Sequence, residues 1–278
     1  MFASIGRTWS IVKICWAILQ KDRELVVFPV FSGASAILII LIWSGLASGL
    51  GALDRLFGES ELTNVDYVLL LIIYFIVSFV IIFFNSALVG AAMIRIRGGD
   101  PTVKDGLKIA MSRVSTIAGW AIISASVGLV LRILSNASRR SDNVIGQIAV
   151  AIGAAAWAYT TFFVIPVLVV ENVGPIESIK RSKSLLRQTW GEQVTANFGF
   201  GVMGVFVFLV AMVPAIVFAQ VSPALGLVLA VLGGISAALV VTTMDGIFKA
   251  ALYEYAAEDL VADGFETSLL RDSYKASH

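Results

Sequence analysis

The stretch VDYVLLLIIYFIVSFVIIFFNSALVGAAMI, residues 65–94, contains a single charged residue, Asp66. A helix needs roughly 20 mostly apolar residues to cross a bilayer. This stretch is longer, so we expect it to tilt or to project from the membrane. The chain is 58% hydrophobic and 14% charged, whereas a soluble domain has about 45–50% apolar and about 25% charged residues. We therefore predict an all-α fold, a polytopic membrane helical bundle.

Six segments are long and apolar enough to be transmembrane helices. They are residues 26–50, 65–94, 114–134, 144–170, 194–219 and a segment from 223 to beyond 253. Pro166, near the end of the fourth segment, predicts a bend because proline removes a backbone donor. The sixth segment is too long for one crossing, so we expect its last turns to stand in the cytoplasm.

Lysine and arginine are concentrated on alternate connections between the spans. The N-terminal segment, the linkers after the second and fourth spans, and the C-terminal part carry 16 of the 20 basic residues. Basic residues favour the cytoplasmic side. We therefore expect a multi-pass protein of the cell (cytoplasmic) membrane with both termini in the cytoplasm.

Three basic segments have the spacing of amphipathic surface helices. The predicted apolar faces are Ile5, Trp9, Val12, Trp16 and Leu19 in the first, Val103, Leu107, Ala110 and Val114 in the second, and Ile176, Ile179, Leu186 and Trp190 in the third, with Leu185 off the face. Pro101 and Pro175 predict the starts of the second and third helices.

Each surface helix leads into a pair of spans, so the sequence predicts three repeats of a surface helix followed by a transmembrane hairpin. The repeat units are approximately 1–97, 98–171 and 172–262 of one integral membrane domain, 1–278. Residues 263–278 form a cytoplasmic tail, in which 263–274 predict a weak fourth surface helix.

No catalytic residue, metal site or cofactor is expected from the sequence. The chain has one cysteine, Cys15, and one histidine, His278, so it lacks the clusters that bind zinc or haem and the histidine of a general base. The candidate intramembrane polar residues are Asn85, Glu171, Asp245 and Lys249. Two interpretations stay open for them, structural pairing and a pathway for an ion or substrate.

The basic residues of the surface helices are candidate contacts for lipid headgroups or a partner protein. They are Lys104, Lys108, Arg113, Lys180, Arg181, Lys183 and Arg187, and the candidate interfacial anchors are Trp9, Trp16 and Trp190. Membrane lipids, chiefly anionic ones, are the expected partners. A nucleic-acid partner is not expected, because the basic surface is small.

Small residues mark several spans, for example Gly45 and Gly49 in the first and Gly233 and Gly234 in the sixth. Such positions let helix backbones approach closely. They predict packing within the bundle, and a contact in a homo-oligomer is the alternative.

Three longer blocks carry a family resemblance. They are RTWSIVKICWAILQKDRELVVFPVFSG (7–33), GGDPTVKDGLKIAMSRVSTIAGWAIISASVGLVLRIL (98–134) and FFVIPVLVVENVGPIESIKRSKSLLRQTWGE (162–192). The chain resembles an uncharacterised family of prokaryotic six-span integral membrane proteins, distantly similar to the membrane domain of glycerophosphodiester phosphodiesterases. The resemblance implies an all-α membrane bundle with cytoplasmic surface helices, and it implies no reaction because the catalytic barrel is missing.

Three hypotheses for the function follow. The first is a non-enzymatic channel or transporter element, acting alone or as an oligomer. The second is a membrane scaffold that recruits anionic lipids or a partner protein through its basic amphipathic helices. The third is a lipid-processing membrane enzyme that works with carboxylates alone.

Overall fold

The structure, a computed structural model, describes residues 2–57, 63–141, 143–190 and 199–258. The described residues form helices and no strand, which confirms the all-α prediction. The predicted surface helix at 263–274 lies outside the described residues.

The elements are α1 (Phe2–Lys21), the 3₁₀ helix η1 (Arg23–Val26), α2 (Val27–Gly49), α3 (Ala52–Phe57), α4 (Asn64–Ile96), α5 (Val103–Ser112), α6 (Val114–Arg140), α7 (Val144–Thr160), α8 (Val164–Val170), α9 (Pro175–Trp190), α10 (Gly199–Ala219) and α11 (Pro223–Glu258).

Five helical segments of the described chain are long and apolar enough to cross a membrane. They are Arg23–Gly49, Asn64–Ile96, Val114–Arg139, Val144–Val170 and Pro223–Glu258, and each overlaps a predicted span. The remaining predicted span overlaps α10, of which Val207–Ala219 forms a shorter apolar helix, and its first residues, 194–198, lie outside the described chain. The chain is therefore a multi-pass membrane protein by the length and composition of its helices, while the six-span repeat stays a prediction.

The fourth span is interrupted between α7 and α8, one turn before Pro166. Proline lacks a backbone N–H and its ring crowds the residue four positions earlier, here Phe162. The break at residues 161–163 falls where that effect is expected, so the helix is interrupted next to the proline at which the sequence predicts a bend. The hydroxyls of Thr160 and Thr161 both donate to the carbonyl of Trp157, at 3.0 and 2.7 Å, at the end of α7.

The chain divides into two compact units. Unit 1 comprises Met1–Val30, Leu88–Gly106 and Ser184–His278, and unit 2 comprises Phe31–Ala87 and Leu107–Lys183. Unit 1 therefore gathers three separate stretches of the chain, and unit 2 gathers two.

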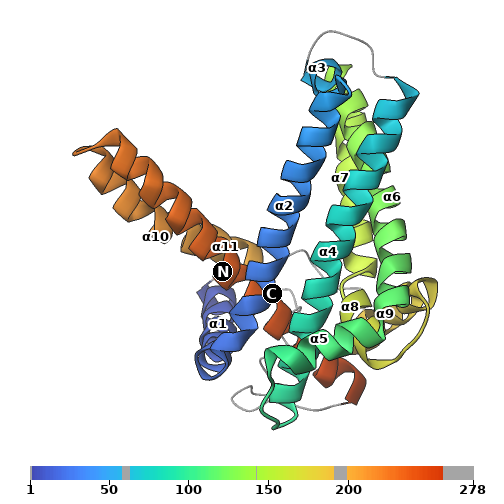
Figure 1. Cartoon of the computed structure of the whole chain (residues 1–278). Coiled ribbons are helices and arrows are strands. Elements are labelled where there is room, and N and C mark those ends of the chain that lie inside the picture. Colours follow the sequence, from blue (N-terminus) through green and yellow to red (C-terminus); the bar gives the residue numbers. More distant parts are fainter. Residues whose placement is uncertain (1, 58–62, 142, 191–198, 259–278) are drawn as a thin grey trace. The chain divides into compact units, whose positions relative to one another are not determined.

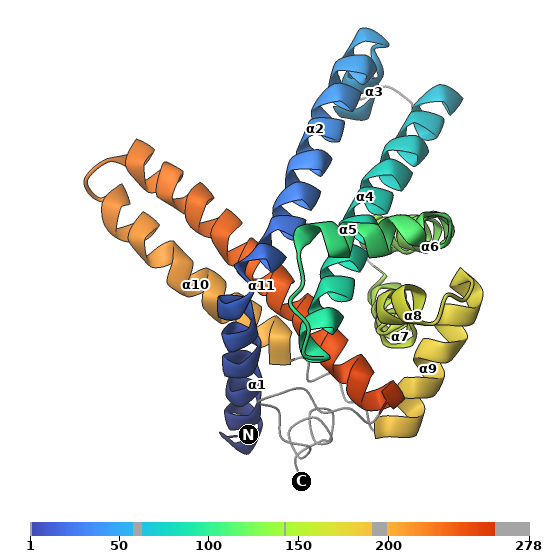
Figure 2. The ribbon, with the colours of Figure 1, turned by 60° about the horizontal axis from the view of Figure 1, so that its bottom comes forward.

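In unit 1, α10 and α11 form an antiparallel hairpin, against which α1 packs (Figures 1 and 2). Gly233 of α11 lies so close to α10 that an added Cβ would stand 2.6 Å from the carbonyl oxygen of Ala211. A Cβ on Gly204 would stand 3.3 Å from the side chain of Val241. These glycines let the two backbones meet, which supports the predicted packing role of small residues in this pair of helices.

In unit 2, α6 and α7 run side by side and are joined by stacked indoles. The rings of Trp120 and Trp157 lie 5.7 Å apart at an interplanar angle of 18°. Trp120 is buried, so it belongs to the packed interior rather than to an interfacial belt. Gly119 of α6 adjoins Pro175, the first residue of α9, with only 3.0 Å from an added Cβ to the proline ring.

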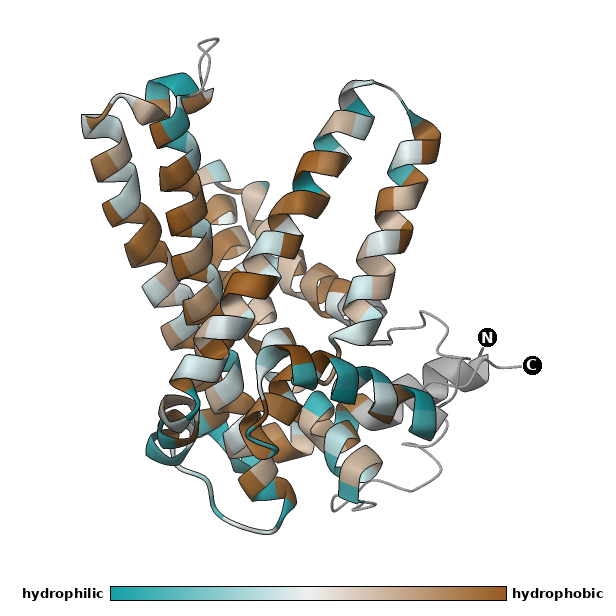
Figure 3. Ribbon diagram, turned by 90° about the vertical axis from the view of Figure 1, so that its right-hand side faces the viewer, coloured by the Kyte–Doolittle hydropathy of each residue, from teal (hydrophilic) through white to brown (hydrophobic). Residues whose placement is uncertain are grey.

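The short helices of unit 2 lie at the two ends of its long helices. The α8 and α9 segments lie at one end, near the start of α6, and α3 lies at the opposite end (Figure 1). Hydrophobic residues follow the long helices and hydrophilic residues concentrate at their ends and on the short helices (Figure 3). This distribution is typical of helices that span a bilayer.

Two of the predicted apolar faces are shifted in the structure. In α1 the buried residues include Cys15, Ile18 and Leu19, whereas Trp16 is 43% exposed. In α9 the prediction for Leu185 is wrong, since this residue is buried, and Ile176, predicted to be on the apolar face, is 63% exposed. The buried face of α9 also carries Ser178 and Ser182. A count of apolar residues misplaces such a face because serine is buried readily when its hydroxyl is hydrogen-bonded.

Candidate functional site

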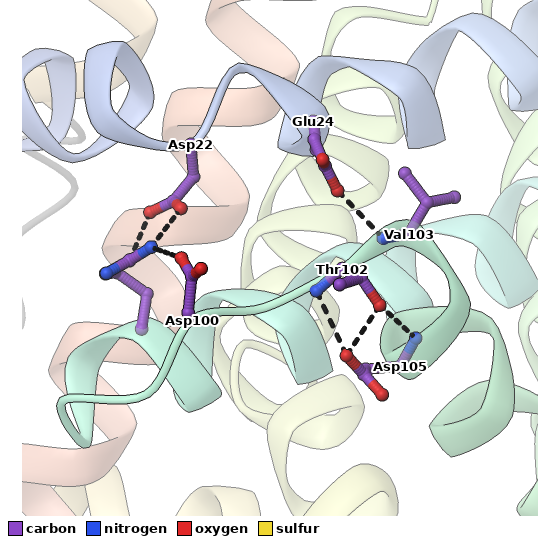
Figure 4. Close-up of polar contacts among 7 residues, drawn as sticks. Asp22, Glu24, Asp100, Thr102, Val103 and Asp105 are labelled. Atoms are coloured by element: carbon purple, nitrogen blue, oxygen red, sulfur yellow. Dashed lines mark hydrogen bonds and ion pairs between the residues drawn. The ribbon is translucent and has the colours of Figure 1, made fainter.

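One group of charged residues in unit 1 lies where the start of η1 contacts the end of α4. Both carboxylate oxygens of Asp22 accept hydrogen bonds from the guanidinium of Arg95, which also donates to Asp100 (Figure 4). Asp22 is buried and Asp100 is exposed. The contact joins residues 73 positions apart and fixes the start of the first span against the end of the second.

The N-terminus of α5 is capped from two directions. Thr102 and Asp105 form a capping box, in which each backbone N–H is accepted by the other side chain, at 3.1 and 3.2 Å (Figure 4). The carboxylate of Glu24 accepts the N–H of Val103 at 3.1 Å. Pro101 lies before the helix rather than in it, so Thr102 and not the predicted proline sets the start.

A second long-range pair in unit 1 joins Arg97 to Glu254 on α11, at 2.9 Å. Glu254 is fully buried and the side chain of Arg97 is 48% exposed. The carboxylate raises the pKa of Arg97 above its ordinary value, chiefly through their hydrogen bonds. A buried carboxylate without this partner would be costly, so the pair is a structural requirement of the fold.

Each ionisable intramembrane candidate has a partner in its own unit. Lys249 bonds Asp245 at 2.7 Å within α11, in the i, i+4 arrangement that the sequence predicts. Glu171, at the end of α8, accepts from Arg181 of α9 at 2.8 Å. Glu171 is thus paired with a linker arginine, one of the two interpretations left open. Asn85 is half-buried on α4.

The break between α7 and α8 is closed by a serine that sequence reasoning missed. The backbone N–H of Phe163 donates to the buried Oγ of Ser182 at 2.9 Å. Ser178, one turn earlier on α9, donates to the carbonyl of Gly174 at 2.9 Å. Hence α9 is bound to the interrupted span by a hydroxyl. A serine spacing of four residues was the only signal in the sequence.

The basic candidates differ in exposure. Arg181 is half-buried and donates to Glu171, and the side chains of Lys104, Lys108, Lys180, Lys183 and Arg187 are exposed. On α5, Lys104, Lys108 and the 61% exposed Met111 follow one another at i, i+4 and i+7. On α9, Ile176, Lys180 and Lys183 follow at the same spacing, so both helices present a face of two lysines and one apolar residue.

Arg113 lies between α5 and α6 and differs from the other basic candidates. Its residue is half-buried, and its Nε atom is buried without a hydrogen-bond partner among the residues that the structure describes. Of the predicted tryptophan anchors, Trp16 is exposed on α1, as an anchor requires. The side chains of Trp9 and Trp190 lie outside the described part.

The sequence matches a known protein family over most of its length. A family of unknown function, DUF6159, matches residues 64–264. The chain belongs to this family. The match includes both lysine faces, the α7–α8 break and the α10–α11 hairpin. No curated protein matches the chain. The similarity to the membrane domain of glycerophosphodiester phosphodiesterases therefore stays a prediction.

No group of three or more histidine, cysteine, aspartate or glutamate side chains suited to a metal ion occurs among the described residues of this DUF6159 member. The carboxylates of Asp22, Glu171 and Glu254 each pair with an arginine. The chemical groups available for binding are the exposed ammonium groups of the two lysine faces, which lie beside long apolar helices.

Proposed function

We propose that the protein is a membrane scaffold that binds anionic lipid headgroups through the lysine faces of α5 and α9. The observation that carries the proposal is the repeated face of two exposed lysines and one exposed apolar residue. An interfacial helix uses such a face, because the apolar side chain enters the acyl boundary while the ammonium groups reach the phosphates. The bias of basic residues supports a cytoplasmic location for this end of the helices.

The expected binding of anionic lipid by each helix is modest, and the contributions of its lysines add. A lysine near an anionic surface contributes about 1 kcal/mol, so each helix contributes about 2 kcal/mol. An integral protein does not need this energy to stay in the membrane. It serves instead to enrich anionic lipid around the protein or to set the position of the surface helices. The proposal contains no catalytic step and no cofactor.

The proposal is tested with full-length protein reconstituted in phosphatidylcholine vesicles. Quenching of tryptophan fluorescence by brominated phosphatidylglycerol, relative to brominated phosphatidylcholine, measures the lipid preference. We expect wild-type protein to prefer phosphatidylglycerol, and a Lys180→Gln, Lys183→Gln variant to lose several-fold of that preference. The matched control is Glu177→Gln, an exposed residue of the same helix, which should not lower it. Unchanged preference in the double variant would refute lipid binding by α9.

A transport element is the second candidate, and the break between α7 and α8 favours it. Discontinuous spans often form the binding sites of transporters. Against it, Glu171, Asp245 and Lys249 are engaged in ion pairs, which leaves fewer charges to line a pathway. Flux through proteoliposomes, with Asn85→Leu and Asp245→Asn for comparison, tests this candidate. An absence of flux for every ion and small solute tried would sink it.

A further inference from the structure

The interrupted fourth span of unit 2 has two possible acceptors for one of its backbone donors. In an uninterrupted helix the N–H of Phe163 would donate to the carbonyl of Tyr159, four residues earlier. In the structure this N–H donates instead to the Oγ of Ser182 on α9, at 2.9 Å. Phe163 and Ser182 are both fully buried, so bulk water has no access to the donor. Ser182 therefore satisfies a donor that the break between α7 and α8 removes from the helical pattern.

A second contact ties α9 to the other end of α8. The two helices are neighbours along the chain and lie side by side (Figure 2). The Nε of Arg181 donates to both carboxylate oxygens of Glu171, at 2.8 and 3.1 Å. Phe163 is the N-cap residue of α8 and Glu171 is its C-cap residue. The consecutive residues Arg181 and Ser182 therefore hold both ends of this short helix.

The interrupted form and a continuous helix each carry one cost. Pro166 has no N–H to offer the carbonyl of Phe162, and its ring crowds that residue, so a continuous helix through this region is unfavourable. Without Ser182, the interrupted form would leave the buried N–H of Phe163 without an acceptor, which is also unfavourable. The two costs are of the same order, so one hydrogen bond is enough to change which form is more stable.

We infer that α9 is a strap that holds the fourth span in its interrupted form. While the strap is in place, Phe163 donates to Ser182, and Arg181 pairs with Glu171. When α9 moves away, the N–H of Phe163 returns to the carbonyl of Tyr159, and α7 and α8 join into one longer helix. The inference concerns the conformation of the span and is independent of the proposed binding of lipid.

The test measures the distance between two spin labels on the full-length protein by pulsed electron paramagnetic resonance. The labels are attached to Ile145→Cys, near the start of α7, and Ile176→Cys, near the start of α9, both exposed positions, while the native Cys15 is buried. We expect one distance with Ser182 present. Ser182→Ala should raise the ratio of the continuous to the interrupted form about tenfold, because the interrupted form loses the acceptor of a buried donor. A second, longer distance should then appear.

Ser178→Ala is the matched control. Ser178 is also fully buried on α9, but its hydroxyl donates to the carbonyl of Gly174, which immediately precedes the same helix. This variant should therefore keep the single distance. Adding Pro166→Ala to Ser182→Ala should increase the longer component further, because alanine supplies the N–H that the carbonyl of Phe162 lacks in a continuous helix.

Three results would overturn the inference. The first is an unchanged distance in folded Ser182→Ala. The second is an equally large longer component in Ser178→Ala, which would indicate a general loosening of α9. The third is a longer component that Pro166→Ala does not increase, which would show that α9 moves without a joining of α7 and α8. If Ser182→Ala does not fold, Pro166→Ala alone decides. It should produce a smaller longer component with the strap intact, and an unchanged distance would refute the strap.

Discussion

Each unit contains its own ion pairs, and the pairs of the two units differ in the sequence separation of the residues that they join. In unit 1, Asp22–Arg95 and Arg97–Glu254 join residues 73 and 157 positions apart. In unit 2, Arg55–Asp66 and Glu171–Arg181 join residues only 11 and 10 positions apart. Long-range pairs in unit 1 connect separate stretches of the chain, whereas the pairs in unit 2 fix local turns.

Burial of the carboxylate does not follow this sequence separation. Glu254 of unit 1 and Asp66 of unit 2 are both fully buried, while Glu171 is 23% exposed and water can compensate it. A charge stranded in the interior costs far more than one at a surface. The comparison therefore teaches that ion pairs in unit 1 connect distant stretches of the chain, and that the cost of breaking a pair depends on how deeply its carboxylate is buried.

Removal of Arg97 should have the largest effect. Arg97→Ala leaves Glu254 buried and unpaired, so we expect a loss of about 3 kcal/mol in the free energy of unfolding. Cys15 reports on unit 1, because burial, together with the nearby Asp245 carboxylate, raises the pKa of its thiol and keeps it unreactive. The rate of maleimide labelling at Cys15 should rise in the variant. Adding Glu254→Gln to this variant should restore part of the lost free energy of unfolding. No restoration would show that the loss does not come from the broken Arg97–Glu254 pair.

A methyl group on Gly233 should have the next largest effect. Gly233→Ala places a Cβ against the backbone of Ala211, and we expect a loss of about 2 kcal/mol, typical of overpacking. Gly45→Ala is the matched control, since an added Cβ meets no described atom within 4 Å there. Thermal unfolding in detergent measures both variants. Equal midpoints for the two would contradict close packing of α10 against α11.

Removal of Arg181 should have the smallest effect and gives the sharpest contrast with Arg97. Arg181→Ala exposes Glu171 to water, so we expect a loss of about 1 kcal/mol or less. The near-ultraviolet circular dichroism of the stacked Trp120 and Trp157 monitors unit 2. A loss as large as that of Arg97→Ala would contradict the expected difference between a buried carboxylate and a partly exposed one.

The spans were predictable because length and apolar composition act locally. Residues 65–94 and the helix Asn64–Ile96 agree within two residues at either end. The pairing of Asp245 with Lys249 was equally predictable from the sequence, because the i, i+4 spacing of a helix places both on one face. The buried face of α9 was not predictable in this way, because Ser182 is buried where it accepts a hydrogen bond from Phe163, which lies before α8.

The sequence by itself determined that this chain is an all-α, multi-pass membrane protein, where its long helices lie, and that its basic residues gather on alternate connections. Hydrophobic burial and bilayer thickness impose these features on each segment separately. Only the tertiary structure decided that Asp22 meets Arg95, that Arg97 meets Glu254, and that the Nε of Arg113 is buried without a hydrogen-bond partner among the described residues. Such contacts depend on how distant helices pack, and no local pattern of residues specifies that packing.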